Sequence, residues 1–264
     1  MKNLYVLALL FFLLIILVFG VFIPQNLYEA NYSLTNISPS LSHIFGTDYF
    51  GRDMFFLSLK GLAFSVFIGL FASLISSIIA LFLGFISAMF GGIVDEFINW
   101  LIDLFMGIPH ILLLILISIM CGGGIFGVIV GISLTHWPSL TRVIRAEILQ
   151  IRQKPYIKAA KKFGKNDIHV ALVHIFPHVL PQYIVGLILL FPHAVLHEAA
   201  ITFLGFGLPI EMPAIGNILS NAMKYLGAGN WWLAFFPGFM LLFVVLSFDF
   251  LANRLKNSLQ MKRN

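Results

Sequence analysis

The sequence predicts an all-α integral membrane protein with six transmembrane helices. Of its 264 residues, 60% are hydrophobic and only 10% are charged, whereas soluble domains are about 45–50% apolar and about 25% charged. A soluble domain has no way to cover so much apolar surface, and disordered chains are poor in apolar residues. Long uncharged runs also recur along the chain. Lipid is therefore the expected solvent.

Three uncharged runs account for the first four expected spans. Residues 4–23 form a run of 20, about the length of a membrane-crossing helix. A cleaved signal peptide is the alternative, but its apolar core is usually about 7–15 residues long. Residues 61–94 predict one long helix. Residues 104–141 are too many for one span, and the triple glycine at 122–124 divides them.

The division at this triple glycine gives the third and fourth helices. We expect the third helix to begin near Phe97, with Asp103 in its first turns and a kink at Pro109. The fourth then runs from about Ile125 to beyond Trp137.

Two later runs complete the set. Residues 168–196 and 231–250 predict the fifth and sixth spans. Residues 201–210 are apolar but too few to cross, so a surface or re-entrant loop is expected there.

The basic residues predict the orientation. Eight of the 16 lysines and arginines lie within residues 142–165, and four more close the chain at 254–263. In a chain this apolar, such clusters indicate cytoplasmic loops rather than nucleic-acid binding. With Lys2 also inside, both termini and the 141–167 segment are cytoplasmic, and 13 of the 16 basic residues share that side. We expect a multi-pass cell-membrane protein.

The chain divides into three parts on this basis. Residues 1–60 form an N-terminal anchor helix and an extracytoplasmic loop, residues 61–255 the main transmembrane domain, and residues 256–264 a cytoplasmic tail.

The cytoplasmic 141–167 segment predicts a short helix with an apolar face. Tyr156, Ala159, Ala160 and Phe163 recur at helical spacing among cations, and Gly164 predicts the helix end. Such a face suits docking into a groove on a soluble partner, and an interfacial helix on anionic lipid is the alternative.

A family resemblance favours docking. Residues 156–164, followed by Pro177, resemble the coupling loop of the permease subunits of ATP-binding-cassette importers, in which a short helix docks on the ATPase. The family's usual glutamate is Lys158 here. The resemblance implies that these residues couple the chain to its ATPase: Tyr156, Lys158, Ala159, Ala160, Phe163 and Gly164.

Two further matches narrow the family. Residues 46–53 resemble the G-T-D-x-x-G-R-D signature of dipeptide, oligopeptide and nickel permeases, with six fixed positions in eight residues. Residues 198–207, 213–217 and 231–238 resemble the C-terminal third of the same permeases. The signature residues can also be purely structural, since aspartates cap turns and arginine bridges carboxylates. They are Gly46, Thr47, Asp48, Gly51, Arg52 and Asp53.

Four of the eight histidines form i, i+4 pairs. His174 and His178 lie near the basic loop, whereas His193 and His197 lie near the outer end of the fifth span, beside Glu198. Two imidazoles on one helix face can share a cation, and ionisable residues at membrane depth tend to face a pathway. The segment 192–198 resembles nickel and metal-chelate permeases more than peptide permeases. His193, His197 and Glu198 are therefore candidate substrate-pathway residues, and a structural role at the helix end is the other interpretation.

Enzymatic function is not expected. His197 and Glu198 begin an H-E-x-x-H string, but Ile201 occupies its last position. The chain has no phosphate-binding G-x-x-x-x-G-K-[ST] loop, and its single Cys121 excludes a disulfide framework or a cysteine-based zinc site. We expect no cofactor in this chain, with ATP and magnesium bound by partner subunits.

The resemblance implies a permease subunit that forms half of the pathway of an ATP-driven importer. Its implied partners are a second permease, two ATP-binding subunits, an extracytoplasmic binding protein and membrane lipid. Nickel or a metal chelate is the first expected substrate, and a dipeptide or oligopeptide is the alternative. A stand-alone channel or receptor remains the alternative of another class.

Overall fold

The computed structural model describes residues 14–16 and 18–261, and most of these residues are helical. Four helical stretches are long and apolar enough to cross a membrane: 54–90, 124–152, 167–203 and 232–257. Two bent helix pairs bring the number of candidate spans to as many as six. The expected all-α membrane fold is confirmed. Residues 4–13 of the expected first span lie outside the described residues, while residues 14–16 and 18–22 are helical.

Helix α2 (Met54–Phe90) begins earlier than the hydropathy predicted. Asp53 caps its first turn, since Oδ1 of Asp53 accepts hydrogen bonds from the amides of Phe55 (2.9 Å) and Phe56 (3.4 Å). Lys60 is tolerated inside the helix because its Nζ donates to the carbonyl of Val21 at 2.8 Å. The helix ends at Gly91, whose φ of +67° is a conformation that glycine adopts without strain.

The expected third helix is divided into two. Helix α3 (Gly92–Gly107) starts immediately after α2, and α4 (His110–Met120) follows at an angle of 99°. The prediction of a start near Phe97 and a kink at Pro109 was therefore wrong. Proline cannot donate the helical hydrogen bond and disfavours helical backbone at the residue before it, so Ile108 adopts extended backbone and the helix breaks.

Helix α5 (Gly124–Arg152) is longer than expected and takes up nearly half of the 141–167 polar segment. Two arginines on α5 form hydrogen bonds with acidic residues on α3. These pairs explain why α5 extends through a charged part of the sequence. Arg145 Nε donates to Asp95 Oδ1 at 2.6 Å, and Arg142 donates to Asp103. Asp103 thus lies well inside α3 instead of in its first turns.

The rest of the basic segment forms a short hairpin of helices. Helix α6 (Pro155–Lys162) is followed by α7 (Asp167–His169), by the π-helix η3 (Val170–Ile175) and by α8 (Phe176–Phe203). The π-turn directly precedes Pro177, which lacks an amide proton, and such irregular turns are common where the helical ladder is interrupted.

Beyond α8 the chain turns over residues 204–214 before α9 (Ile215–Met223) and the last long helix, α10 (Trp232–Met261). The non-spanning loop expected at 201–210 therefore starts at Leu204, after α8 has ended. Helix α10 continues through residues 256–261, so this part of the expected tail is helical.

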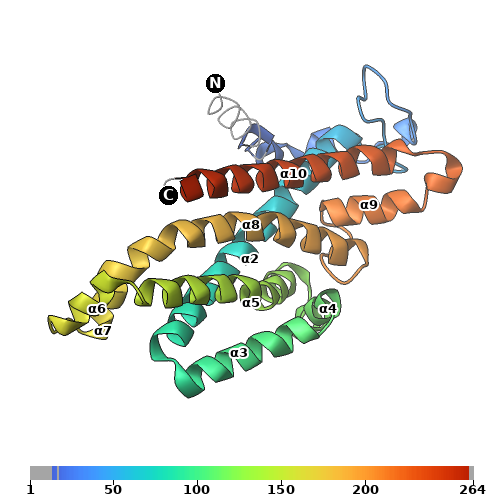
Figure 1. Ribbon diagram of the computed structural model, residues 1–264. Coiled ribbons are helices and arrows are strands. Elements are labelled where there is room, and N and C mark those ends of the chain that lie inside the picture. Colours follow the sequence, from blue (N-terminus) through green and yellow to red (C-terminus); the bar gives the residue numbers. More distant parts are fainter. Residues whose placement is uncertain (1–13, 17, 262–264) are drawn as a thin grey trace.

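Helices α2, α5 and α8 pack against one another at the centre of the bundle, with α10 against α8 (Figure 1). Small residues allow the close approach. A Cβ added at Gly84 on α2 would lie 2.8 Å from Cγ2 of Ile144 on α5, and a Cβ added at Gly69 would lie 2.5 Å from Cγ2 of Val195 on α8. Because lipid provides no hydrophobic drive between helices, such close packing is a main source of stability in membranes.

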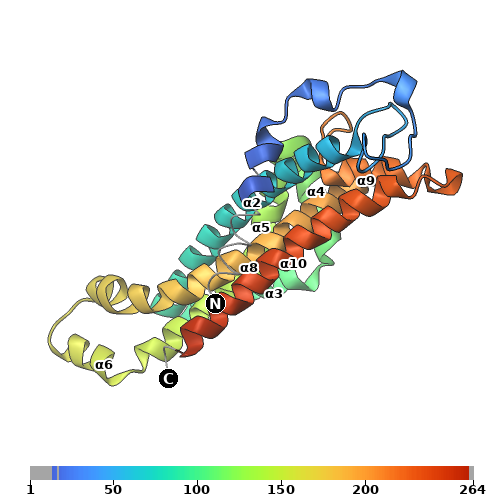
Figure 2. The ribbon, with the colours of Figure 1, turned by 90° about the horizontal axis from the view of Figure 1, so that it is seen from above.

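The two sets of polar segments lie at opposite ends of this bundle. Figure 2 shows α6 at one end and the segment 24–53 together with α9 at the other. The end of α10 lies on the α6 side in both views (Figures 1 and 2). Which of the two ends faces the cytoplasm stays a prediction from the basic residues.

Candidate functional site

Helix α6 is held to the bundle by one side and leaves the other side free. Proline at its first position suits a helix start. Ile157 is only 1% exposed and joins the core cluster that includes Ile151 and Val170, and Ala160 packs against the same cluster. The helix ends in a Schellman turn, in which the amide of Lys165 donates to the carbonyl of Ala160 at 3.2 Å and Gly164 has a φ of +80°.

The free side of α6 carries apolar and cationic groups. Phe163, directly after the helix, is 85% exposed, and Tyr156 is 43% exposed with its ring 5.9 Å from that of His178. Lys158 and Ala159 are exposed as well. The sequence placed Ala159 and Ala160 on one docking face, but the structure separates them, because Ala160 faces the bundle.

The G-T-D-x-x-G-R-D loop at the opposite end is held by contacts among its own residues and neighbours. Asp48 Oδ1 accepts from the amides of Phe50 and Arg52, and its Oδ2 accepts from Arg52 Nε at 2.8 Å. Thr47 Oγ1 donates to the carbonyl of Leu34, and the carbonyl of Thr47 accepts from Trp232 Nε1 at 3.3 Å. The loop thereby connects the 24–53 segment to α2 and α10.

The glycines of this loop leave no room for a side chain. Gly46 and Gly51 have φ values of +71° and +73°. A Cβ at Gly46 would lie 2.6 Å from the carbonyl oxygen of Ile37, and one at Gly51 would lie 1.8 Å from that of Asn31. These contacts give the signature loop, residues 46–53, a structural role, and we call this loop the clasp. Within it, burial raises the pKa of the Tyr49 phenol.

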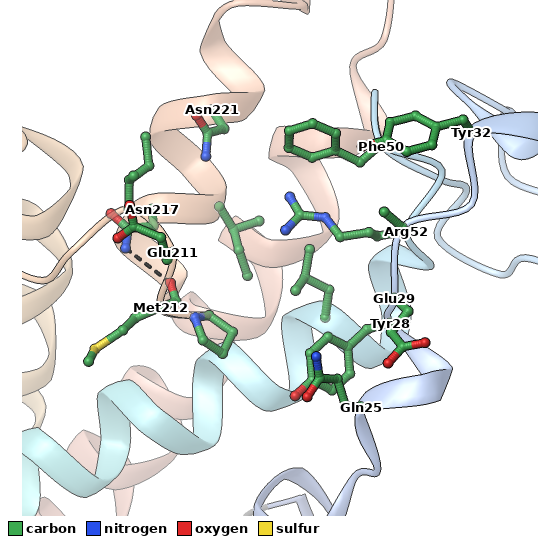
Figure 3. Close-up of a pocket in the computed structure, with 15 residues that line it drawn as sticks. Gln25, Tyr28, Glu29, Tyr32, Phe50, Arg52, Glu211, Met212, Asn217 and Asn221 are labelled. Atoms are coloured by element: carbon green, nitrogen blue, oxygen red, sulfur yellow. Dashed lines mark hydrogen bonds between the residues drawn. The ribbon is translucent and has the colours of Figure 1, made fainter.

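A pocket of about 350 Å³ opens beside this clasp, between the 25–52 segment and the start of α9. Figure 3 shows the guanidinium of Arg52 extending into it from one wall, with Glu211 and Asn217 on the facing wall and Glu29 nearby. Asn217 is held in place by its Nδ2, which donates to the carbonyls of Pro209 (2.7 Å) and Met212 (3.1 Å). The pocket thus offers groups of both charge signs together with amides.

A second cavity, of about 640 Å³, lies at the break between α3 and α4. Four histidines line it: His110 on α4, His136 on α5, and His193 and His197 on α8. One ring nitrogen from each of His110, His136 and His197 lies within 4.8 Å of the others. His193 is exposed and contributes its carbonyl oxygen, which is 2.8 Å from His197 Nδ1.

The structure therefore unites His197 with two histidines that sequence reasoning did not single out. His110 and His136 are isolated in apolar helices and have no i, i+4 partner. The available signal was their position at membrane depth, where ionisable residues are uncommon. His174 lies beside His169, with ring centroids 5.9 Å apart, and His178 lies beside Tyr156.

Glu198 lies apart from this histidine group. Its side chain is fully buried, and its Oε1 accepts from Thr202 Oγ1 at 2.9 Å. Its Oε2 has no hydrogen-bond partner among the described residues. Successive residues of a helix point about 100° apart, which places Glu198 on a different face of α8 from His197.

Comparison with known proteins identifies the family. Residues 80–260 match the model of the family described as "Binding-protein-dependent transport system inner membrane component". The chain is 30% identical over 257 residues to the dipeptide transport system permease protein DppC of Bacillus subtilis (strain 168), covering 97% of this chain and 80% of the relative. It is 29% identical over 258 residues to the oligopeptide transport system permease protein OppC of the same organism, covering 96% and 84%.

A solved structure shows the same fold. The chain superposes with a TM-score of 0.64 on a chain of the MetNI methionine ABC transporter in an inward-facing conformation, at 18% sequence identity. The match covers 78% of this chain and 97% of the other.

The relatives correct one expectation. The chain resembles dipeptide and oligopeptide permeases, whereas the sequence patterns favoured the nickel type. The preference for the nickel type rested on the few residues of segment 192–198. The similarity to the peptide permeases, in contrast, extends along nearly the whole chain. The protein is a multi-pass, non-catalytic inner-membrane subunit without a cofactor of its own, and it belongs to the family of binding-protein-dependent transport system inner membrane components.

Proposed function

We propose that this chain is the permease subunit of an ATP-driven importer of dipeptides or oligopeptides and forms half of its translocation pathway. The observation that carries the proposal is α6, a short helix with exposed apolar residues on a loop at the end of the bundle opposite the signature loop. A channel or receptor that works alone has no need of such a helix. Family membership and the names of the relatives support the same function.

In this proposal, α6 transmits the movements of an ATPase to the bundle. Tyr156 and Phe163 enter a groove on the ATPase, while Ile157 and Ala160 hold α6 against the core shared by α5 and α8. A displacement of α6 therefore moves α5 and the start of α8 with it. These two helices extend towards the opposite end of the bundle (Figure 2). Such coupling is what alternating access requires.

The proposed assembly contains a second permease, two ATP-binding subunits and an extracytoplasmic binding protein. The last of these docks at the end that carries the 24–53 segment and α9. Lys154, Lys158, Lys162 and Lys165 surround α6, whereas Arg52, Lys60 and Lys224 lie in or beside the segments at the other end. This distribution favours a cytoplasmic α6 and a cytoplasmic C-terminus.

Peptide is the substrate that the pocket of Figure 3 suits better than a bare metal cation. A short peptide carries an ammonium group, a carboxylate and amide groups, and the pocket presents carboxylates, a guanidinium and amides. A bare cation would use only the carboxylates, whereas a peptide can also engage the guanidinium and the amides. Nickel or a metal chelate is the second candidate, favoured by the imidazoles of the other cavity.

The topology has a direct test by cysteine labelling. In a Cys121→Ser background, Lys162→Cys places a thiol on the exposed end of α6, and Ala228→Cys places one on the exposed turn at the opposite end. An impermeant maleimide added outside spheroplasts is expected to label Ala228→Cys alone, and to label Lys162→Cys only after the membrane is opened. Labelling of Lys162→Cys in intact spheroplasts would reverse the proposed orientation.

A further inference from the structure

We propose that His110, His136 and His197 form a binding site for a divalent transition-metal ion of the Zn²⁺ or Ni²⁺ type. The inference concerns binding, and it does not depend on whether the metal is transported or on the peptide-import function. The three residues come from α4, α5 and α8, so only the folded bundle brings them together.

The three imidazoles are close enough to share one ion. Their ring centroids are 4.6 Å (His110 to His136), 4.6 Å (His110 to His197) and 4.9 Å (His136 to His197) apart, and the rings are strongly inclined to one another. Tetrahedral ligands at a zinc–nitrogen distance of about 2.1 Å are roughly 3.4 Å apart. Ligand nitrogens within 4.8 Å of one another therefore need to approach by at most roughly 1.4 Å, which side-chain rotation can supply.

Backbone carbonyls hold two of the rings in a ligating tautomer. His136 Nδ1 lies 3.0 Å from the carbonyl oxygen of Ile132, and His197 Nδ1 lies 2.8 Å from that of His193. Because a carbonyl oxygen only accepts, the Nδ1 that faces it donates in each ring, and the Nε2 of that ring keeps its lone pair. Nε2 of His136 also lies 3.2 Å from Nδ1 of His197, a contact that a shared ion would replace. Metal-binding histidines are characteristically supported in this way, with the other ring nitrogen donating to a carbonyl or carboxylate.

The third histidine has an unsatisfied nitrogen. Nε2 of His110 is buried and has no hydrogen-bond partner among the described residues. A buried polar atom without a partner is costly, and a bound metal ion would satisfy it. Three neutral imidazoles that only hydrogen-bond with one another would leave this nitrogen unexplained.

The cavity supplies access and an open ligand position. His110 and His197 are half-buried, and the space of about 640 Å³ beside them admits water or a ligand atom as the fourth donor. Glu198 lies on a different face of α8, and no acidic residue is among those that line this cavity. Three histidine ligands with an open fourth position are the arrangement of open zinc sites, as distinct from closed four-ligand structural ones.

The test uses Co²⁺, whose visible absorption reports its coordination geometry. The assembled transporter is purified without a polyhistidine tag and titrated with Co²⁺, followed by competition with Zn²⁺. We expect a bound ion with the intense bands of four-coordinate cobalt, displaced by Zn²⁺. His110→Gln and His197→Gln are each expected to weaken binding by at least the ~10–100-fold that loss of a supporting residue costs at metal sites. Both residues are half-buried, so the test does not rely on the buried His136.

Two histidine variants outside the proposed ligand set serve as controls. His193→Gln keeps the carbonyl that holds His197, and His178→Gln changes a histidine beside α6, so both are expected to bind Co²⁺ as the unmodified protein does. Absence of four-coordinate cobalt, or an affinity for Co²⁺ in His110→Gln and His197→Gln equal to that of the unmodified protein, would overturn the proposal. Loss of binding in His193→Gln and His197→Gln, with His110→Gln unaffected, would overturn the three-histidine site and assign binding to the i, i+4 pair instead. Peptide uptake measured on the same preparations reports the proposed function separately.

Discussion

Replacing Phe163 with aspartate is expected to abolish ATP-driven uptake. The Phe163 side chain lies directly after α6 and is 85% exposed. In the proposed complex it enters a groove on the ATPase, where a carboxylate would lose its hydration without gaining a partner. Phe163→Ala is expected to lose about 2 kcal/mol or more of docking energy, which is about 30-fold in affinity. The measurements are copurification of the ATPase and ATP-dependent uptake in proteoliposomes.

Ile168→Asp is the matched control for this effect. Ile168 is 69% exposed in the adjacent α7, so the substitution makes the same kind of change outside α6. It is expected to retain ATPase binding and most uptake. Ala160→Glu is unsuitable as a docking test, since Ala160 packs against the core of the chain itself. Normal uptake by Phe163→Asp with the ATPase still bound would refute the docking role of α6.

Replacing Gly51 with alanine is expected to prevent the protein from accumulating in the membrane. The added Cβ would lie 1.8 Å from the carbonyl oxygen of Asn31, at a φ of +73° that alanine rarely adopts. To relieve this overlap, the backbone around Asn31 must move away from the backbone around Gly51. That movement breaks the hydrogen bond from the amide of Asn31 to the carbonyl of Phe50 (2.9 Å). Because neither backbone can move alone, we expect a loss of several kcal/mol. Membrane protein level and the thermal stability of the purified complex measure it.

The Gly229→Ala variant is the control for Gly51→Ala, because it has the backbone strain of a positive φ without the steric clash. Gly229 also has a positive φ, +88°, but nothing lies within 4 Å of the position of an added Cβ. Its replacement is therefore expected to cost only the ~1–2 kcal/mol of the left-handed conformation. Equal stability of the Gly51→Ala and Gly229→Ala proteins would contradict the clasp described for the signature loop.

Hydropathy located the long helices because the membrane demands uncharged runs, but it did not locate their ends. Helix α2 begins at Met54 because Asp53 caps it, and the capping residue could have been recognised in the sequence. Helix α5 continues to Arg152 because acidic residues of α3 accept its arginines. That pairing depends on tertiary contact. Pro109 was recognised as an interruption, but whether it bends or breaks a helix depends on how the two halves pack.

In the candidate sites too, features set by neighbouring residues in the sequence were predictable, whereas features set by contacts between helices were not. The apolar spacing and Gly164 correctly predicted a short helix that stops at this glycine, and the structure places it at Pro155–Lys162. Which apolar residues face the bundle was decided by α5 and η3, so Ala160 could not be separated from Ala159 in advance. The i, i+4 rule paired His193 with His197, whereas the folded bundle pairs His197 with histidines of two other helices. Contacts of that kind have no local sequence pattern.

The substrate is the most direct test of the proposed function. Proteoliposomes are prepared with this chain, its partner permease and both ATPase subunits, with the binding protein outside and ATP inside. Uptake of a labelled dipeptide, a labelled oligopeptide and radioactive Ni²⁺ is measured, with a second preparation containing the Phe163→Asp variant. We expect ATP-dependent uptake of peptide that the variant abolishes, and no ATP-dependent uptake of Ni²⁺. ATP-dependent uptake of Ni²⁺ without uptake of either peptide would contradict the proposal that this chain is a peptide permease.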